Sequence, residues 1–190
     1  ISIDTMEPAV ARAALEAGAD IVNDVSGLRD PEMIEVCAAS ECGVVAMHMR
    51  GEPGTMQDAP AYDDVVGEVR GFFEERFATL TAAGIAAEAL CFDPGIGFGK
   101  TIGHNLALLR ALPDLEVGGR PLLVGVSRKS FIGRLLERDA MADREWPTVA
   151  LTAWTRESGA RIHRVHEVRP NREALRMIEA VIEGPEWMAS

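Results

Sequence analysis

Short apolar runs alternate with longer stretches of helical period along the whole chain. Strands and helices that alternate in this way are typical of a parallel sheet built from β-α units. The pattern predicts strands at residues 1–3, 21–25, 43–48, 90–93, 121–126 and 161–166. It predicts helices at residues 8–18, from 31 onward, 63–83, 103–112, 131–138, 147–157 and 170–183, with a loop at 141–146. We therefore expect six β-α units in a single α/β domain over residues 1–190.

Acidic residues outnumber basic residues, 30 against 19, which gives a formal net charge of −11. This balance disfavours nucleic-acid and membrane partners, because anionic surfaces are bound mainly by Lys and Arg. No apolar run approaches the roughly 18 residues that a membrane span needs. The three cysteines have no CxxC spacing, as expected of reduced thiols in a cytoplasmic protein. We expect a soluble, cytoplasmic protein.

Polar residues follow the predicted strands, at the points where the strands end. They are Asp4 and Thr5, Asn23 and Asp24, His48, Asp93, Ser127 to Lys129, and Arg164 to His166. In parallel α/β folds the carboxyl ends of the strands form the face where ligands bind. Any one of these residues could instead cap a helix or hydrogen-bond within a loop. Because all six strands carry at least one, we predict a shared site.

A Gly-rich turn with the sequence DPGIGFGKT runs from Asp93 to Thr101. It misses the phosphate-binding pattern GxxxxGK[ST], because Pro94 stands where the first Gly is needed. It also lacks the third Gly of the dinucleotide-binding pattern GxGxxG. Two interpretations stay open. The glycines either turn a strand into a helix, or let a flat ligand approach the backbone above Asp93.

The segment Gly125-Val-Ser-Arg-Lys129 resembles the nucleophile elbow GxSxG, but Lys129 replaces the last Gly. This difference disfavours a serine hydrolase. A lysine directly after a buried strand is costly to leave unpaired. We expect Lys129 to meet a ligand oxygen or a carboxylate, with a solvated loop position as the alternative.

Arg164 and His166 lie two residues apart, so strand alternation places them on one face and His163 on the other. A guanidinium beside an imidazole suits a phosphate or pyrophosphate. This pair therefore predicts an anion site. The alternative is a structural salt bridge from the pair to Glu167 or Asp4.

Taken in order, these segments resemble the dihydropteroate synthases, a folate-pathway family that sulfonamide drugs target. The resemblance rests on ISIDT at 1–5, NDVSG at 23–27, MHMRGEPGTMQ at 47–57, DPGIGFGKT at 93–101 with His104-Asn105, GVSRKSFIG at 125–133 and RVH at 164–166. It implies a TIM (β/α)₈ barrel. It also implies a transferase that joins 6-hydroxymethyl-7,8-dihydropterin pyrophosphate to p-aminobenzoate, with release of pyrophosphate and 7,8-dihydropteroate.

The resemblance also implies roles for individual residues. For the pterin it implies Asp4, Asn23, Met47, Asp93, Phe98, Gly125 and Lys129. For the pyrophosphate it implies Arg164 and His166 together with Mg²⁺, and for p-aminobenzoate it implies Ser127 and Ser130 nearby. The implied catalytic residues are Lys129, Arg164 and His166. A homodimer through late helices such as 147–157 is implied as well.

The expected barrel has eight strands and about 250 residues, whereas six strands are predicted in these 190 residues. We expect the two N-terminal units to be absent, and with them the Asn by which the family helps bind Mg²⁺. We therefore expect a chain of this length to bind pterin yet turn over little. Two alternatives remain open: a corrinoid-dependent methyltransferase acting on methyltetrahydrofolate, and a catalytically inactive pterin-binding remnant.

Overall fold

The computed structural model describes residues 1–51, 56 and 60–184. Its strands are β1 (Ser2–Asp4), β2 (Ile21–Asp24), β3 (Gly43–Met47), β4 (Leu90–Asp93), β5 (Leu123–Val124) and β6 (Ile162–His163). Its α-helices are α1 (Pro8–Glu16), α2 (Pro31–Ser40), α3 (Val65–Ala82), α4 (Ile102–Arg110), α5 (Ser130–Leu136), α6 (Glu145–Glu157) and α7 (Val168–Glu183). Short 3₁₀ turns are η1 (Ala87–Ala89), η2 (Leu112–Leu115) and η3 (Ala142–Arg144).

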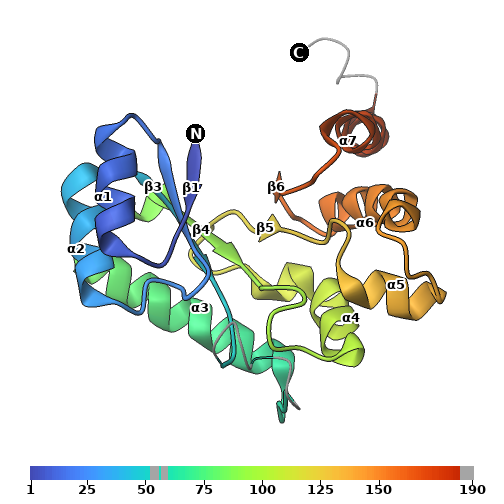
Figure 1. Ribbon diagram of the computed structural model, residues 1–190, viewed down its shortest axis with the longest axis horizontal. Coiled ribbons are helices and arrows are strands. Elements are labelled where there is room, and N and C mark those ends of the chain that lie inside the picture. The colour runs from blue at the N-terminus through green and yellow to red at the C-terminus, as the bar shows by residue number, and fades with distance from the viewer. Residues whose placement is uncertain (52–55, 57–59, 185–190) are drawn as a thin grey trace.

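The strands of the described residues are parallel and lie side by side in chain order. β1 to β4 form one sheet, β5 pairs with β6, and a single bridge between Phe92 and Leu122 joins the two groups. Helices follow the strands and lie outside them (Figure 1). The predicted α/β class with six β-α units is confirmed. Because all strands run the same way, their carboxyl ends share one edge.

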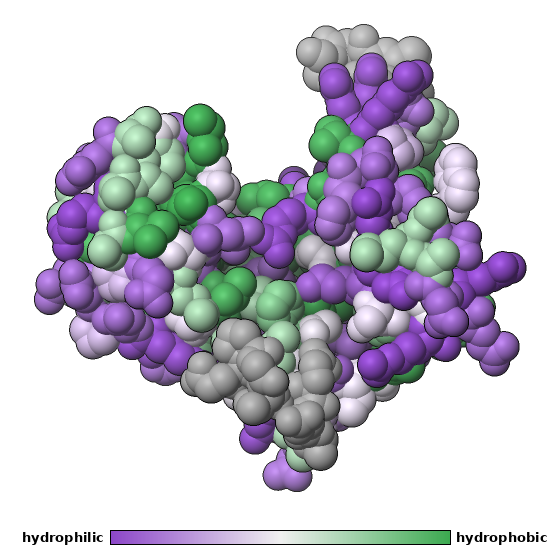
Figure 2. All heavy atoms as spheres, in the orientation of Figure 1, coloured by the Kyte–Doolittle hydropathy of each residue, from purple (hydrophilic) through white to green (hydrophobic). Residues whose placement is uncertain are grey.

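β1 and β6 end the row and face each other across an opening (Figure 1). Figure 2 shows the molecule hollowed between the side that carries β1 with α1 and the side that carries α7. A contact crosses from one end strand to the other, because Arg164 Nη1 donates to Asp4 Oδ2 at 2.6 Å. The two ends of the row are therefore linked at their carboxyl edge.

The core lies between the strands and the helices that cover them. Alternate residues of the central strands, such as Val44 and Phe92, are buried against helix residues such as Val69, Phe73 and Leu108. The rings of Phe73 and Phe92 stack at 4.8 Å between centroids, which holds α3 against β4. Burial of large apolar side chains is the main stabilising contribution, so this layer fixes where β4 ends. No helix of the described part is long and apolar enough to cross a membrane.

Two helices begin near the positions that the sequence predicts, each at a residue whose side chain caps the helix. The Asp30 carboxylate accepts from the Glu32 N–H and begins α2, and Thr101 forms a capping box with His104 at the start of α4. Side-chain oxygens at these positions satisfy N–H groups that have no partner inside the helix.

The structure differs from the predicted boundaries in its last third. β5 and β6 are two residues long, shorter than predicted, although the bond from Arg164 N to Val124 O continues their pairing. Residues 141–146 are not a loop, since η3 and the start of α6 occupy them. Proline is tolerated in a first helical turn, so Pro147 does not mark the first residue of α6. Residues 52–55 and 57–59 lie outside the described residues, and most of them belong to the 47–57 block on which the resemblance rests.

Asp24, at the end of β2, provides a test of how the strand end is held. Its fully buried carboxylate accepts from Ser26 N, Ser26 Oγ and Leu28 N at 2.7–3.0 Å. Asp24→Ala would leave buried N–H groups unpaired, so we expect a loss of about 2–3 kcal/mol in the free energy of unfolding. Chemical denaturation measures this loss. Asp30→Ala, which removes an exposed helix cap, should cost only about 1 kcal/mol. Equal losses in the two variants would contradict the view that the buried Asp24 carboxylate holds the end of β2.

Candidate functional site

The ends of the first two strands and the last one converge on the Asp4 carboxylate. Asn23 donates from Nδ2 to Asp4 Oδ1, and Arg164 donates to Asp4 Oδ2. Asn23 is buried at the end of β2, whereas the side chains of Asp4 and Arg164 are 59% and 43% exposed. Of the two alternatives that the sequence leaves open for Arg164, the structure shows the ion pair to Asp4. An ion pair this exposed is weak, so an incoming anion can compete for the guanidinium.

Asp93 is the buried acceptor of the site, with 4% of its surface exposed at the end of β4. Its Oδ1 accepts from Gly95 N at 2.7 Å. Burial raises the pKa of the Asp93 carboxyl, and the Gly95 N–H and the cations Lys129, Arg164 and Lys100 oppose this rise. Asp93 therefore combines a costly buried position with surroundings that favour the charged form.

The Gly-rich turn after Asp93 lies directly against the end of β3. Gly95, at φ +64°, leaves no room for a Cβ, which would overlap the His48 carbonyl oxygen. A Cβ on Gly99, at φ +60°, would likewise overlap the Arg50 carbonyl oxygen. These glycines permit the positive φ values and the close approach of two backbone segments. Glycine is therefore required at these two positions for the close approach of the backbones, and not only to turn a strand into a helix.

Lys129 reaches back over this turn from the end of β5. Its Nζ lies 4.1 Å from the centre of the Phe98 ring, a cation–π contact. Burial lowers the pKa of the Lys129 ammonium, and the charge of Asp93 opposes that decrease. Lys129 is therefore not a solvated loop residue. It carries a partly buried charge between an aromatic face and a carboxylate.

The anion-binding pair predicted on the last strand lies beside Ser127. His166 Nδ1 lies 2.8 Å from Ser127 Oγ, and the same oxygen accepts from His166 N at 3.2 Å. His163 points to the other side, where its Nε2 contacts Thr155 Oγ1 of α6 at 2.9 Å. The predicted alternation on this segment is thus present. Arg164, His166 and the Ser127 hydroxyl supply three polar groups to one place.

A cavity of about 580 Å³ opens at this edge. Its lining contains Asp4, Gly125, Ser127, Arg128, Lys129, Met141, Arg164, Val165 and His166. Six of the predicted site residues are therefore together in one cavity. The others lie outside its lining. Asn23 is buried in β2, Met47 is buried at the end of β3, Asp93 is buried at the end of β4, Phe98 lies under Lys129, and Ser130 is exposed at the start of α5.

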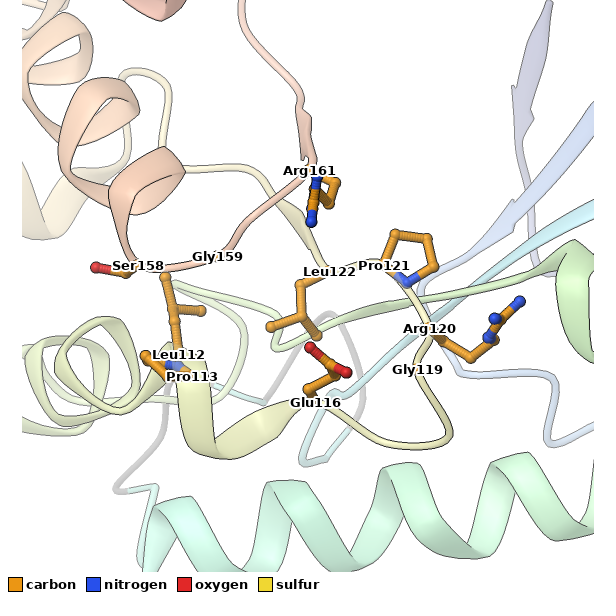
Figure 3. Close-up of a pocket in the computed structure, with 10 residues that line it drawn as sticks. All are labelled: Leu112, Pro113, Glu116, Gly119, Arg120, Pro121, Leu122, Ser158, Gly159 and Arg161. Atoms are coloured by element: carbon orange, nitrogen blue, oxygen red, sulfur yellow. The ribbon is translucent and has the colours of Figure 1, made fainter. Parts of the chain in front are cut away.

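A second hollow of about 390 Å³ lies at the opposite ends of the strands (Figure 3). It is lined by residues that precede β5 and β6, among them Pro121, Leu122 and Arg161. The amino-terminal face of such strands serves stability rather than catalysis in known barrels. We therefore assign the candidate site to the cavity at the carboxyl ends.

Two contributors, Met141 and Lys100, were not among the predicted site residues, and Arg128 was predicted at the strand end without a role. Met141 and Arg128 line the cavity, and Arg128 is fixed by ion pairs to Glu145 at 3.0 Å and Glu167 at 2.7 Å. Lys100 is buried below the Gly-rich turn, where its Nζ lies 3.0 Å from His48 Nδ1. The sequence signal for Lys100 was its place in DPGIGFGKT, which drew attention only as an incomplete phosphate-binding pattern.

A metal ion was also expected, bound with the pyrophosphate. Within residues 1–51, 56 and 60–184 no group of three or more His, Cys, Asp or Glu side chains is arranged to hold a metal. The basic groups at the anion side, Arg164 and Arg128, are unsuited to coordinate a cation. The described residues therefore do not by themselves fit a Mg²⁺ site.

The chain matches known proteins over most of its length. The family described as pterin binding enzyme matches residues 1–166. The dihydropteroate synthase of Escherichia coli (strain K12) is 44% identical over 186 residues, covering 98% of this chain and 66% of that protein. The chain thus spans just under two thirds of this curated relative.

Solved structures give the same result. Dihydropteroate synthase from Thermus thermophilus in complex with 6HMPPP has a TM-score of 0.90 and 43% identity, over 95% of this chain and 72% of that one. Dihydropteroate synthase from Xanthomonas albilineans in complex with 7,8-dihydropteroate has a TM-score of 0.90 and 42% identity, over 97% and 67%.

Consecutive parallel β-α units with an acceptor and cation cluster at their carboxyl ends define an α/β protein of the TIM-barrel class. The match over residues 1–166 then identifies the group within that class. The chain belongs to the pterin binding enzyme family.

Gly95 tests whether the close approach of the two backbones is required. Gly95→Ala would place a Cβ against the His48 carbonyl at a positive φ, so we expect a loss of at least about 2 kcal/mol in stability. Thermal unfolding measures the change. Gly103→Ala is the control, because a Cβ there meets only Thr101 Oγ1 at 3.8 Å and a helical alanine is favourable. If both variants melted like the parent, the close approach would not constrain the fold.

Proposed function

We propose that this chain carries the pterin and pyrophosphate surface of a dihydropteroate synthase. The observation that carries the proposal is the division of the site into two chemistries. Buried acceptors lie on β2 and β4, whereas Arg164, His166 and Ser127 lie together beside the open cavity. A ring edge rich in N–H donors suits the first part, and a leaving pyrophosphate suits the second.

On the pterin side, Asp93 is the central acceptor. We assign its free carboxylate oxygen to ring N–H donors, since Oδ1 already accepts from Gly95 N. Asn23 and Asp4, which hydrogen-bond each other, extend the polar edge toward β1. Lys129 faces the ring carbonyl region, with Phe98, Met47 and Gly125 completing the slot. This set selects a ring with donors on one edge and an acceptor beyond it.

On the pyrophosphate side, Arg164 and His166 stabilise charge that develops as the leaving group departs. The amine nitrogen of p-aminobenzoate forms the new C–N bond at the pterin methylene carbon as the C–O bond to pyrophosphate breaks. The leaving group keeps that electron pair, and the amine proton passes to water. We assign Ser127, which lines the cavity, and Ser130, which is exposed at the start of α5, to the vicinity of p-aminobenzoate.

Mg²⁺ with the pyrophosphate stays a prediction. The described residues do not fit a metal site on their own, so no step is assigned to the ion.

A cytoplasmic homodimer completes the proposal. Its support is the exposed apolar surface of and around α6, where Trp146 is 79% and Trp154 is 51% exposed. Large exposed aromatic groups are typical of protein interfaces. The three free, buried cysteines agree with a reducing compartment.

Product formation tests the function. The polypeptide as the cell makes it, and the 190-residue chain in parallel, are incubated with 6-hydroxymethyl-7,8-dihydropterin pyrophosphate and p-aminobenzoate. Chromatographic detection of 7,8-dihydropteroate supports a synthase. Pterin binding without product from either polypeptide would support the inactive pterin-binding alternative. Methyl transfer from methyltetrahydrofolate to a corrinoid would support the methyltransferase alternative.

Asp93→Asn tests the assignment of the pterin acceptor. The amide keeps an oxygen for Gly95 N but loses the charge, so pterin affinity should decrease by about 1.5–3 kcal/mol without loss of folding. Calorimetry with 6-hydroxymethyl-7,8-dihydropterin measures the change. Asp114→Asn, at an exposed position on η2, is the matched control and should bind as the parent does. Unchanged affinity in Asp93→Asn would remove this residue from the site.

Arg164→Ala tests the division between ring and pyrophosphate. We expect about tenfold to hundredfold weaker binding of the pyrophosphate-bearing substrate, because a charged hydrogen bond is lost. Binding of the bare pterin should change far less. Arg161→Ala removes an arginine from the opposite end of the same strand and should alter neither (Figure 3). Equal losses for both ligands in Arg164→Ala would show that the ion pair to Asp4 is purely structural.

A further inference from the structure

Lys100 is a buried cation that the proposed reaction does not use. It is 4% exposed and follows the Gly-rich turn. Its Nζ lies 3.0 Å from His48 Nδ1, and it donates to Phe98 O at 3.0 Å and to His48 O at 3.3 Å. These three partners are uncharged, since burial lowers the pKa of His48 to about 3 and leaves the ring neutral as an acceptor. Burying a lysine whose hydrogen-bond partners are all neutral is costly. The buried position of Lys100 therefore needs an explanation.

The hydrogen bonds of Lys100 join two segments that carry the site. His48 directly follows β3, and its N–H donates to Asp93 O at 2.9 Å. Phe98 lies at the far side of the Gly-rich turn, under Lys129. Lys100 binds the carbonyl groups of both His48 and Phe98, so it fixes the turn against the end of β3.

The charge of Lys100 also acts on Asp93. The cations that face Asp93 are Lys129 from β5, Arg164 from β6 and Lys100 from its own turn. Lys129 and Arg164 are proposed to engage the ligand, and Arg164 already pairs with Asp4. Lys100 differs, because its three bonds go to His48 and Phe98 of the protein itself.

We propose that Lys100 is a positioning residue for pterin binding: it holds the Gly-rich turn against β3 and adds a buried positive charge to the surroundings of Asp93. This inference rests on the proposed function, because it assigns Asp93 to the pterin ring. Lys100 touches no substrate in this proposal. It acts through the position of the turn and through the charge of Asp93.

The sign of the expected pH effect follows from the groups around Asp93. Burial raises the pKa of Asp93, and nearby cations oppose that rise. Removing Lys100 therefore raises the pKa of Asp93 further and extends the neutral form to higher pH. Lys100 itself has a pKa lowered to about 7 by burial, with Asp93 raising it and Lys129 lowering it. At acid pH Lys100 is charged, so its loss matters most there.

The experiment compares Lys100→Gln, which removes the charge but keeps a hydrogen-bond donor, with Lys100→Arg, which keeps the charge. Affinity for 6-hydroxymethyl-7,8-dihydropterin is measured by calorimetry across the acid limb. This ligand carries no phosphate, so the anion side does not contribute. For Lys100→Gln we expect about tenfold weaker binding near pH 6, with recovery at alkaline pH. For Lys100→Arg we expect a profile close to that of the parent.

Thr152→Val is the matched control for loss of stability. Thr152 is buried and donates to Asn171 Oδ1 at 2.7 Å, in the layer between α6 and α7. Its loss should lower the melting temperature without moving the pH profile of pterin binding. A pH-independent loss of affinity in Lys100→Gln, in step with its melting temperature, would overturn the proposal.

A second readout does not depend on pterin. NMR of the protein with ¹³C-labelled Asp carboxyl groups follows the titration of Asp93 in the absence of ligand. A higher pKa of Asp93 in Lys100→Gln than in the parent is expected, and an unchanged pKa would overturn the electrostatic part. If this shift is present but the parent binds no pterin, the proposed function fails while the link from Lys100 to Asp93 stands.

Discussion

The candidate site places a carboxyl group where water barely reaches it. Asp93 is held at the end of β4 by stacking of Phe92 on Phe73 in the core below, so it cannot move toward solvent without disturbing that layer. Burial alone would favour its neutral form. The Gly95 N–H and the cations Lys129, Arg164 and Lys100 oppose the resulting rise in its pKa.

The Gly-rich turn connects these electrostatic effects to backbone geometry. Gly95 brings its N–H to Asp93 only because the backbone takes a positive φ against the His48 carbonyl. Close approach leaves His48 O available to Lys100, whose ammonium also binds Phe98 O. One short segment therefore presents a donor, an aromatic face and a buried cation.

Much of the fold could be predicted from the sequence, and for a simple reason. Parallel strands buried on both faces read as short apolar runs, and helices between them read as longer periodic stretches. The capping residue Asp30 marked the start of α2 by local chemistry. The predicted ends of β5 and β6 were wrong, because pairing with a neighbouring strand decides where such short strands stop. The predicted start of α6 was wrong as well, because proline is tolerated within a first helical turn.

The candidate site was predictable only where residues follow strands directly. Asp4, Ser127, Arg164 and His166 meet because parallel strands end at one edge. Lys100 and His48 meet for another reason: β3 pairs with β4 in the register that sets Met47 opposite Asp93, which a single sequence does not state. The choice of Asp4 over Glu167 as the partner of Arg164 is likewise tertiary, since Glu167 is taken by Arg128.

The ion pair between Arg164 and Asp4 links the two chemistries that the proposed function assigns to the site. Asp4 also accepts from Asn23, and Arg164 lies beside His166 in the cavity lining. In the proposed function, a pyrophosphate that draws Arg164 away would free one oxygen of Asp4 for a ring donor. A pterin that engages Asp4 would in turn weaken the hold of Asp4 on Arg164. A ligand that carries both groups would therefore compete for both partners of this ion pair.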